Sequence, residues 1–101
     1  MLDAKLLNAE QIRKINEKRR SALKKTYIYM LHEIMSRIQK AAEYGKLRTM
    51  YQIPGMIVGF PLYNRNKAAL YIQRQLSILG YTVNVEDTEV SVSWVSKNKR
   101  P

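Results

Sequence analysis

The chain has 101 residues, the length of one domain, and 18 lysines and arginines against 8 acidic residues give it a formal net charge of +10. The absence of cysteine excludes disulfides, zinc–thiolate sites and cysteine nucleophiles. A charge this far from zero attracts polyanions, so nucleic acid, acidic protein surfaces and anionic lipid headgroups are the candidate partners.

Residues 1–45 are rich in helix formers and charge, and they predict one long helix. Asn8 fits an N-cap, Gln11 completes a capping-box pattern, and Gly45 fits the position just past the helix end. The roughly 36 residues between would form a helix about 54 Å long. A break near Ser21, giving two helices, is left open. The second half carries an apolar stripe at spacings of three and four, formed by Leu23, Tyr27, Met30, Leu31, Ile34, Ile38, Ala41 and Ala42.

Residues 46–96 change period. Lys46–Ile53 alternates and predicts a strand with Leu47 among its inward residues. Asn64 fits the N-cap of a second helix, Arg65–Leu79, stopped by Gly80. Alternation at 81–85 and 90–94 around a polar turn predicts a hairpin. The inward residues of the second helix are expected to be Ala69, Ile72, Leu76 and Leu79.

We therefore expect an α+β fold, with a long N-terminal helix followed by a small β-α-β-β domain over 46–96 and a basic tail over 97–101. The sheet should pack on the second helix and on the apolar half of the first. No apolar run approaches the roughly 20 residues of a membrane-spanning helix, so no transmembrane segment is expected. Residues 1–5 do not resemble a signal peptide, which favours a protein made and assembled inside a cell.

The ionisable residues form no catalytic pattern. The single histidine, His32, lies mid-helix and is interpreted as a surface residue. The closest acids, Glu86, Asp87 and Glu89, fall on the hairpin turn, where turn chemistry explains them. Paired carboxylates, a nucleophile–base set and metal-ligand spacing are all missing. We therefore expect no enzyme activity, no cofactor and no metal.

The strongest functional signal is a group of seven cations in the first helix, which we call the basic cluster. It consists of Arg13, Lys14, Lys18, Arg19, Arg20, Lys24 and Lys25. At 100° per residue these cations surround the helix, so this part cannot be buried in its own domain. It either projects into solvent or lies against an acidic partner such as a phosphate backbone or an acidic protein.

Tyr27 and Tyr29 add a second candidate interface. Tyrosine is common at interfaces because it combines a large apolar area with a polar tip. The two residues lie 200° apart on a helix, so both cannot face the same core. We expect one of them to be exposed to a partner.

The second half of the chain resembles small proteins of large nucleocytoplasmic DNA viruses over about residues 50–95. The shared pattern is Tyr51-Gln-Ile-Pro54, Gly59-Phe-Pro-Leu-Tyr63, Tyr71-Ile72, Leu76, Gly80-Tyr81-Thr-Val83 and Val92-Ser93-Trp94. The basic helix lies outside it. The resemblance implies a viral origin and a role as a virion component, and it carries no catalytic residues across.

Two hypotheses follow from these patterns. The first is a minor capsid protein of a large DNA virus, found in the virion and in the host cytoplasm during assembly. It would bind neighbouring capsid subunits through its long basic helix. The second is a nucleic-acid-binding protein that uses the basic cluster on phosphates without reading sequence.

Overall fold

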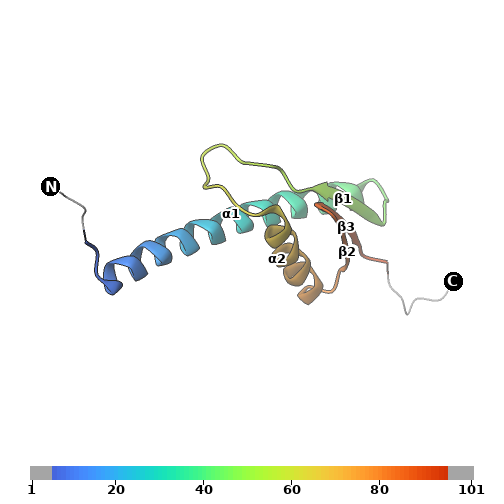
Figure 1. Ribbon diagram of the computed structural model, residues 1–101. Coiled ribbons are helices and arrows are strands. Elements are labelled where there is room, and N and C mark those ends of the chain that lie inside the picture. Colours follow the sequence, from blue (N-terminus) through green and yellow to red (C-terminus); the bar gives the residue numbers. More distant parts are fainter. Residues whose placement is uncertain (1–5, 96–101) are drawn as a thin grey trace.

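A computed structural model describes residues 6–95. Figure 1 shows a long helix whose second half packs against a shorter helix and a small sheet. The elements are α1 (Ala9–Glu43), β1 (Arg48–Gln52), α2 (Arg65–Ile78), β2 (Thr82–Glu86) and β3 (Glu89–Ser93). The expected α+β class, with a long helix and a C-terminal hairpin, is confirmed. The basic tail at 97–101 and the residues 1–5 used for the signal-peptide argument lie outside the described residues.

Helix α1 begins at the capping box that the sequence predicts. The Asn8 side chain accepts a hydrogen bond from the backbone N–H of Gln11 at 2.8 Å, and the Gln11 side chain accepts one from the backbone N–H of Asn8 at 2.9 Å. Two N–H groups at the start of the helix are thereby satisfied. The helix then continues without interruption through Ser21, so the two-helix alternative is wrong.

Both helices end at the glycines that the sequence marks. Gly45 has φ 81°, in the left-handed region that only glycine enters freely. The N–H of Lys46 donates to the carbonyl of Ala41 at 2.9 Å, which completes a Schellman motif. Gly80 ends α2 with the same pair of backbone bonds. Each glycine therefore turns the chain sharply from a helix into a strand.

The three strands form one antiparallel sheet in the order β1-β3-β2. The central strand β3 places Val90 opposite Tyr51 of β1 on one edge and opposite Val85 of β2 on the other. Strand β1 is shorter than the expected 46–53 segment. Leu47 precedes it and is 57% exposed rather than inward, because it lies in the connection that follows Gly45.

One core joins the sheet, α2 and the second half of α1. Its completely buried large side chains are Met30, Ile34, Ile53, Ile72, Leu76, Val90 and Val92, and Thr26 of α1 is completely buried as well. Helix α2 also buries Ala68 and Ala69 against this core. The inward placement expected for Leu79 is wrong. It is 65% exposed because it is the C-cap residue, where the chain turns away at Gly80.

The segment 53–64 joins β1 to α2 and runs beside α1 (Figure 1). The guanidinium of Arg65 holds its start by donating to the carbonyl of Ile53, with Nε at 3.2 Å and NH2 at 2.9 Å. In its middle, the ring of Phe60 lies against the ring of Tyr29 of α1, with centroids 5.1 Å apart. The segment is therefore fixed to the fold at its base and on the flank of α1.

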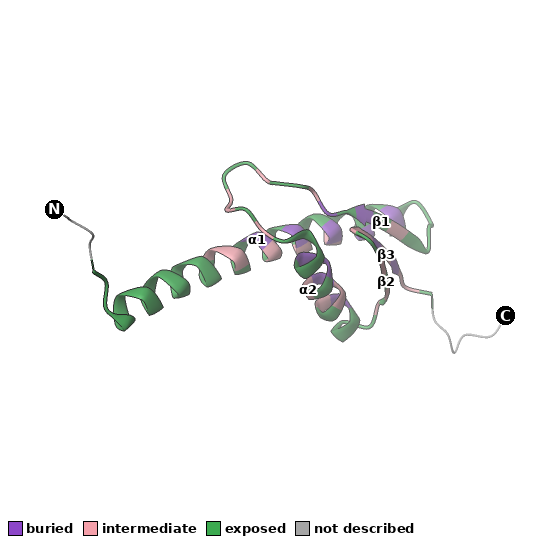
Figure 2. Ribbon diagram, in the orientation of Figure 1, coloured by how far each residue is buried: buried purple, intermediate pink, exposed green. Residues whose placement is uncertain are grey.

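The first half of α1 extends away from this core. Every residue from Leu6 to Ser21 is exposed, as the first turns of α1 in Figure 2 show. We call Ala9–Ser21 the projecting segment. The Cα radius of gyration is 18.4 Å, against about 13 Å for a compact domain of about 100 residues. One helix therefore both supports the core and extends beyond it.

Candidate functional site

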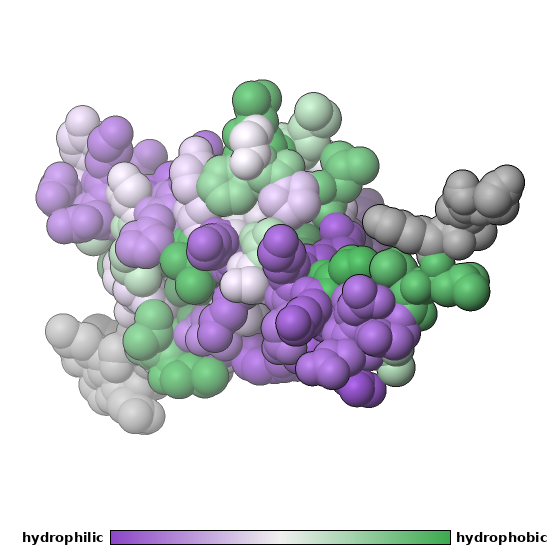
Figure 3. Space-filling model, turned by 90° about the vertical axis from the view of Figure 1, so that its left-hand side faces the viewer, coloured by the Kyte–Doolittle hydropathy of each residue, from purple (hydrophilic) through white to green (hydrophobic). Residues whose placement is uncertain are grey.

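The basic cluster lies on the exposed part of α1, and all seven of its side chains are exposed. Figure 3, viewed toward the N-terminal side of the molecule, shows broad hydrophilic surface interrupted by apolar patches. Within residues 6–95 one salt bridge is present, between Arg20 NH1 and Glu17 Oε2 at 3.9 Å, with side chains 79% and 74% exposed. An ion pair this exposed is weak. The cluster therefore offers nearly all of its positive charge to an external anion.

The cations occupy distinct sides of α1 at about 100° per residue. The groove line, on the side facing α2, consists of Arg13, Arg20 and Lys24. The outer line, about 120° further round, consists of Lys14, Lys18 and Lys25. Arg19 lies on the third side, in line with the buried stripe, and its guanidinium donates to the carbonyl of Leu62 at 3.4 Å. Six of the seven cations therefore form two lines, and Arg19 also holds the 53–64 segment.

A groove separates α1 from α2 where the projecting segment leaves the core. It consists of two hollows that share Tyr27 of α1 and Tyr71 of α2. The first hollow, of about 260 Å³, is lined by Arg20, Leu23, Lys24, Tyr27 and Tyr71. The second, of about 310 Å³, is lined by Tyr27, Lys67, Leu70, Tyr71 and Arg74. We call the two hollows together the α1–α2 groove.

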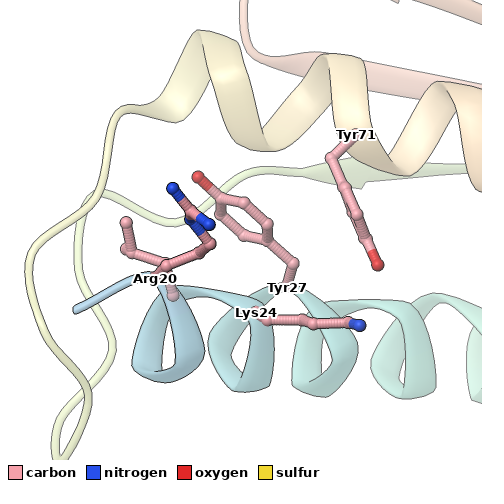
Figure 4. A pocket seen from close by; sticks show the side chains of 5 residues that line it. Arg20, Lys24, Tyr27 and Tyr71 are labelled. Carbon is pink, nitrogen blue, oxygen red and sulfur yellow. The ribbon is translucent and has the colours of Figure 1, made fainter. Parts of the chain in front are cut away.

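The tyrosine pair lies at the centre of this groove. Figure 4 shows Arg20 and Tyr27 extending from α1 toward α2, and Tyr71 extending back toward α1. The two rings are 5.1 Å apart between centroids and tilted by 37°. Each hollow therefore combines a tyrosine surface with two cations, and neither is lined by an acid. Guanidinium and ammonium groups in such a place bind phosphate or carboxylate oxygens.

The two tyrosines named as candidate interface residues lie on opposite sides of α1. Tyr27 is half-buried beside Tyr71 and belongs to the α1–α2 groove. Tyr29 is 40% exposed and packs on Phe60. Each thus has an aromatic neighbour from another part of the chain. Of these two tyrosines of α1, Tyr27 lines the α1–α2 groove beside the basic cluster and Tyr29 does not.

A separate polar contact joins β1 to α1. The Tyr51 hydroxyl donates to Oε1 of Glu33 at 2.7 Å, and the guanidinium carbon of Arg37 lies 5.5 Å from the centre of the Tyr51 ring. Burial raises the pKa of Tyr51, and the hydrogen bond to the Glu33 carboxylate raises it further. The phenol therefore stays protonated as a donor, and the contact has a structural role. His32 is exposed on α1, in agreement with its interpretation as a surface residue.

A membrane-spanning helix and a metal-binding cluster are two other features that residues 6–95 could carry. Neither of the described helices is both long and apolar enough to span a bilayer. The same residues contain no cluster of three or more histidine and acidic side chains placed to hold a metal ion.

Residues 7–77 match a family of unknown function, DUF5759. The chain belongs to this family. The matched region includes all of α1 with its N-cap Asn8, all of β1, and α2 up to its penultimate residue, so it covers both helices of the α1–α2 groove. No curated protein and no solved structure matches the chain significantly. The case for a function therefore comes from the arrangement of the residues themselves.

Sequence reasoning did not identify the half of the groove that α2 provides. Lys67, Tyr71 and Arg74 follow one another at spacings of four and three, which places them on one face of a helix. That pattern was available in the sequence. Their position beside Tyr27 depends on how α2 packs against α1, and local pattern does not determine that packing.

Proposed function

We propose that this protein is a binding protein for nucleic acid that grips the phosphate backbone without reading sequence. The observation that carries the proposal is the exposure of the whole basic cluster on a helix that extends beyond the core. Lysines and arginines that neutralise phosphates release condensed counterions, which makes such binding favourable and independent of sequence.

The dimensions of the projecting segment suit a nucleic-acid groove. An α-helix with its side chains is about 10–12 Å across, and the major groove of a B-form duplex is about 12 Å wide. The groove line and the outer line lie about 120° apart on α1. A helix seated in the groove would direct one line to each phosphate wall.

The hairpin turn is a poorer candidate for this contact. Glu86 and Asp87 are exposed at its tip, and Asp87 adopts φ 62° in the tight connection between β2 and β3. Carboxylates there would repel phosphate. The nucleic acid is therefore expected on α1 rather than at the acidic turn.

A salt titration tests the proposal. Two labelled duplexes of unrelated sequence should bind with equal affinity, and that affinity should fall on the order of 10³-fold between about 50 and 200 mM salt if six phosphates are contacted. Reversing charge with Lys18→Glu and Arg20→Glu should abolish binding. The matched pair Lys40→Glu and Lys46→Glu, also exposed but outside the cluster, should weaken it much less. Binding that does not weaken with salt and is unchanged by Lys18→Glu and Arg20→Glu would refute the proposal.

A minor capsid role is retained as a second candidate, because a phosphate partner does not explain the apolar side of the projecting segment. Ile12 and Ile15 are 43% and 54% exposed on the side of α1 that continues the buried stripe. Leu62, held beside Arg19, is 70% exposed nearby. These side chains would contact a neighbouring capsid subunit in a virion. Salt-resistant copurification with purified virions would favour this candidate, and absence from them would reject it.

A further inference from the structure

We propose that the α1–α2 groove holds an unpaired base of a single-stranded nucleic acid against the Tyr27–Tyr71 pair, with the adjoining phosphates bound by Arg20, Lys24, Lys67 and Arg74. The inference rests on the proposed function and deepens it. It assigns the protein a preference for single strands or for duplexes with unpaired ends.

The first step is the aromatic surface. Tyr27 and Tyr71 come from different helices and are both partly exposed, and each lines both hollows. Bases stack on aromatic side chains irrespective of sequence, because every base has a flat π-face. The leucine in each hollow, Leu23 in one and Leu70 in the other, extends this apolar surface.

Positive charge surrounds the Tyr27–Tyr71 pair. Each hollow brings two cations to the edge of the tyrosine pair, Arg20 and Lys24 from α1 on one side and Lys67 and Arg74 from α2 on the other. One of these cations, Arg20, has a carboxylate partner. It is Glu17, which lies outside the groove lining and reaches Arg20 at 3.9 Å. A purely apolar ligand would bring no counter-charge to these four cations, of which Arg20 has only its exposed pair with Glu17. A strand crossing the groove would supply a flat base and phosphates on both sides.

The position of the tyrosine pair between two helices restricts which bases can reach it. In a duplex both faces of each interior base are covered by its neighbours, so a tyrosine pair set between two helices cannot reach them. An unpaired base can leave its stack at small cost. The hollows, of about 260 and 310 Å³, are at the lower limit of small-molecule sites, which fits a single base against the tyrosine pair better than a larger ligand.

The fourth step is continuity with the basic cluster. Arg20 and Lys24 belong to both the groove line and the lining of the first hollow, so a backbone running along the projecting segment enters the groove without leaving positive surface. The same strand could then occupy both sites. The groove would therefore bind one end of a strand whose backbone lies along the projecting segment.

The test compares the affinities of the full chain for three labelled oligomers, of which the two single strands have equal length and equal charge. These are a thymidine oligomer, the same sugar–phosphate oligomer with every base missing, and a duplex with closed ends. The wild-type protein should bind the thymidine oligomer more tightly than the abasic one by roughly 5- to 150-fold for one stacked base. Equal affinity for these two oligomers would overturn the inference without any mutation.

Variants at Tyr71 locate the base. Tyr71→Leu removes the ring and should lower the affinity for the thymidine oligomer to that for the abasic oligomer. Tyr71→Phe keeps the ring and should retain the advantage. Tyr81→Leu, at a half-buried tyrosine outside the groove, is the matched control and should also retain it. Retention of the full advantage in Tyr71→Leu would overturn the inference.

Failure of the two proposals can be told apart. If the abasic oligomer and the duplex both bind in a salt-dependent way but the bases add nothing, the phosphate grip stands and the groove inference falls. If none of the three oligomers binds at low salt, the proposed function itself falls, and the inference that rests on it falls as well.

Discussion

Removing the outer line of cations from α1 should change the salt dependence of nucleic-acid binding by a calculable amount. The triple variant Lys14→Gln, Lys18→Gln and Lys25→Gln keeps good helix formers at three exposed positions, so each change should alter stability by less than about 0.5 kcal/mol. The first and the last of these lysines are 11 positions apart on α1, or about 16 Å along its axis. That is long enough for each to meet a different phosphate of one strand.

The expected slopes follow from counting contacts. Six phosphate contacts from the two lines give a slope of log affinity against log salt of about −5, and three contacts give about −3. Between about 50 and 200 mM salt, the affinity of the wild-type protein should fall on the order of 10³-fold, and that of the triple variant only about 40-fold.

Fluorescence anisotropy with a labelled duplex measures both slopes. The control is the triple variant Lys40→Gln, Lys46→Gln and Arg48→Gln, which loses the same net charge at exposed positions outside the basic cluster. Its slope should stay near the wild-type value, because general attraction does not release phosphate counterions one for one. Equal slopes in the two triple variants would refute the assignment of contacts to the outer line.

Three further predictions concern stability, measured by urea denaturation. Burial and Glu33 raise the folded-state pKa of Tyr51 above its ordinary 10.0. Above pH 10 the unfolded chain therefore releases a proton that the folded chain keeps, and the free energy of unfolding should fall by at most about 1.4 kcal/mol per pH unit. Tyr51→Phe should make this decline shallower, whereas Tyr44→Phe, at a side chain 80% exposed, should not; identical declines would contradict the reasoning. Ile72→Ala at a completely buried site should cost about 2–5 kcal/mol, and a cost near zero would show a loose core there. Gly80→Ala should cost about 1–2 kcal/mol from its φ of 101° alone, since an added Cβ meets nothing within 4 Å; unchanged stability would contradict that turn geometry.

The ends of both helices could be predicted because they depend on neighbouring residues. Asn8 and Gln11 interact across three positions, and Asn64 accepts from the backbone N–H of Lys67 across three as well. The two terminating glycines act through backbone bonds within five residues. Local chemistry of this kind is fully present in the sequence.

The strand order and the groove depend on contacts between distant residues. Nothing local to β1 shows that it pairs with β3 rather than β2, or that Tyr71 lies 5.1 Å from Tyr27 across 44 positions of sequence. Leu47 was predicted to face inward because the alternation of apolar and polar residues begins before Arg48, the first residue of β1 that pairs with β3. The basic cluster could be proposed as a site from the sequence because phosphate binding needs only exposed cations, whereas the groove depends on the packing of α2 on α1.

The continuity of α1 has a consequence for the free energy of binding. A free peptide must nucleate its helix before it can bind, and a nucleation constant near 10⁻³ corresponds to about 4 kcal/mol. In the intact chain the buried turns around Met30 and Ile34 are already folded, so the projecting segment only extends an existing helix. A peptide of residues 8–25 should therefore bind far more weakly than the same residues in the protein. The core of this small fold acts as a permanent helix nucleus for the segment that reaches outward.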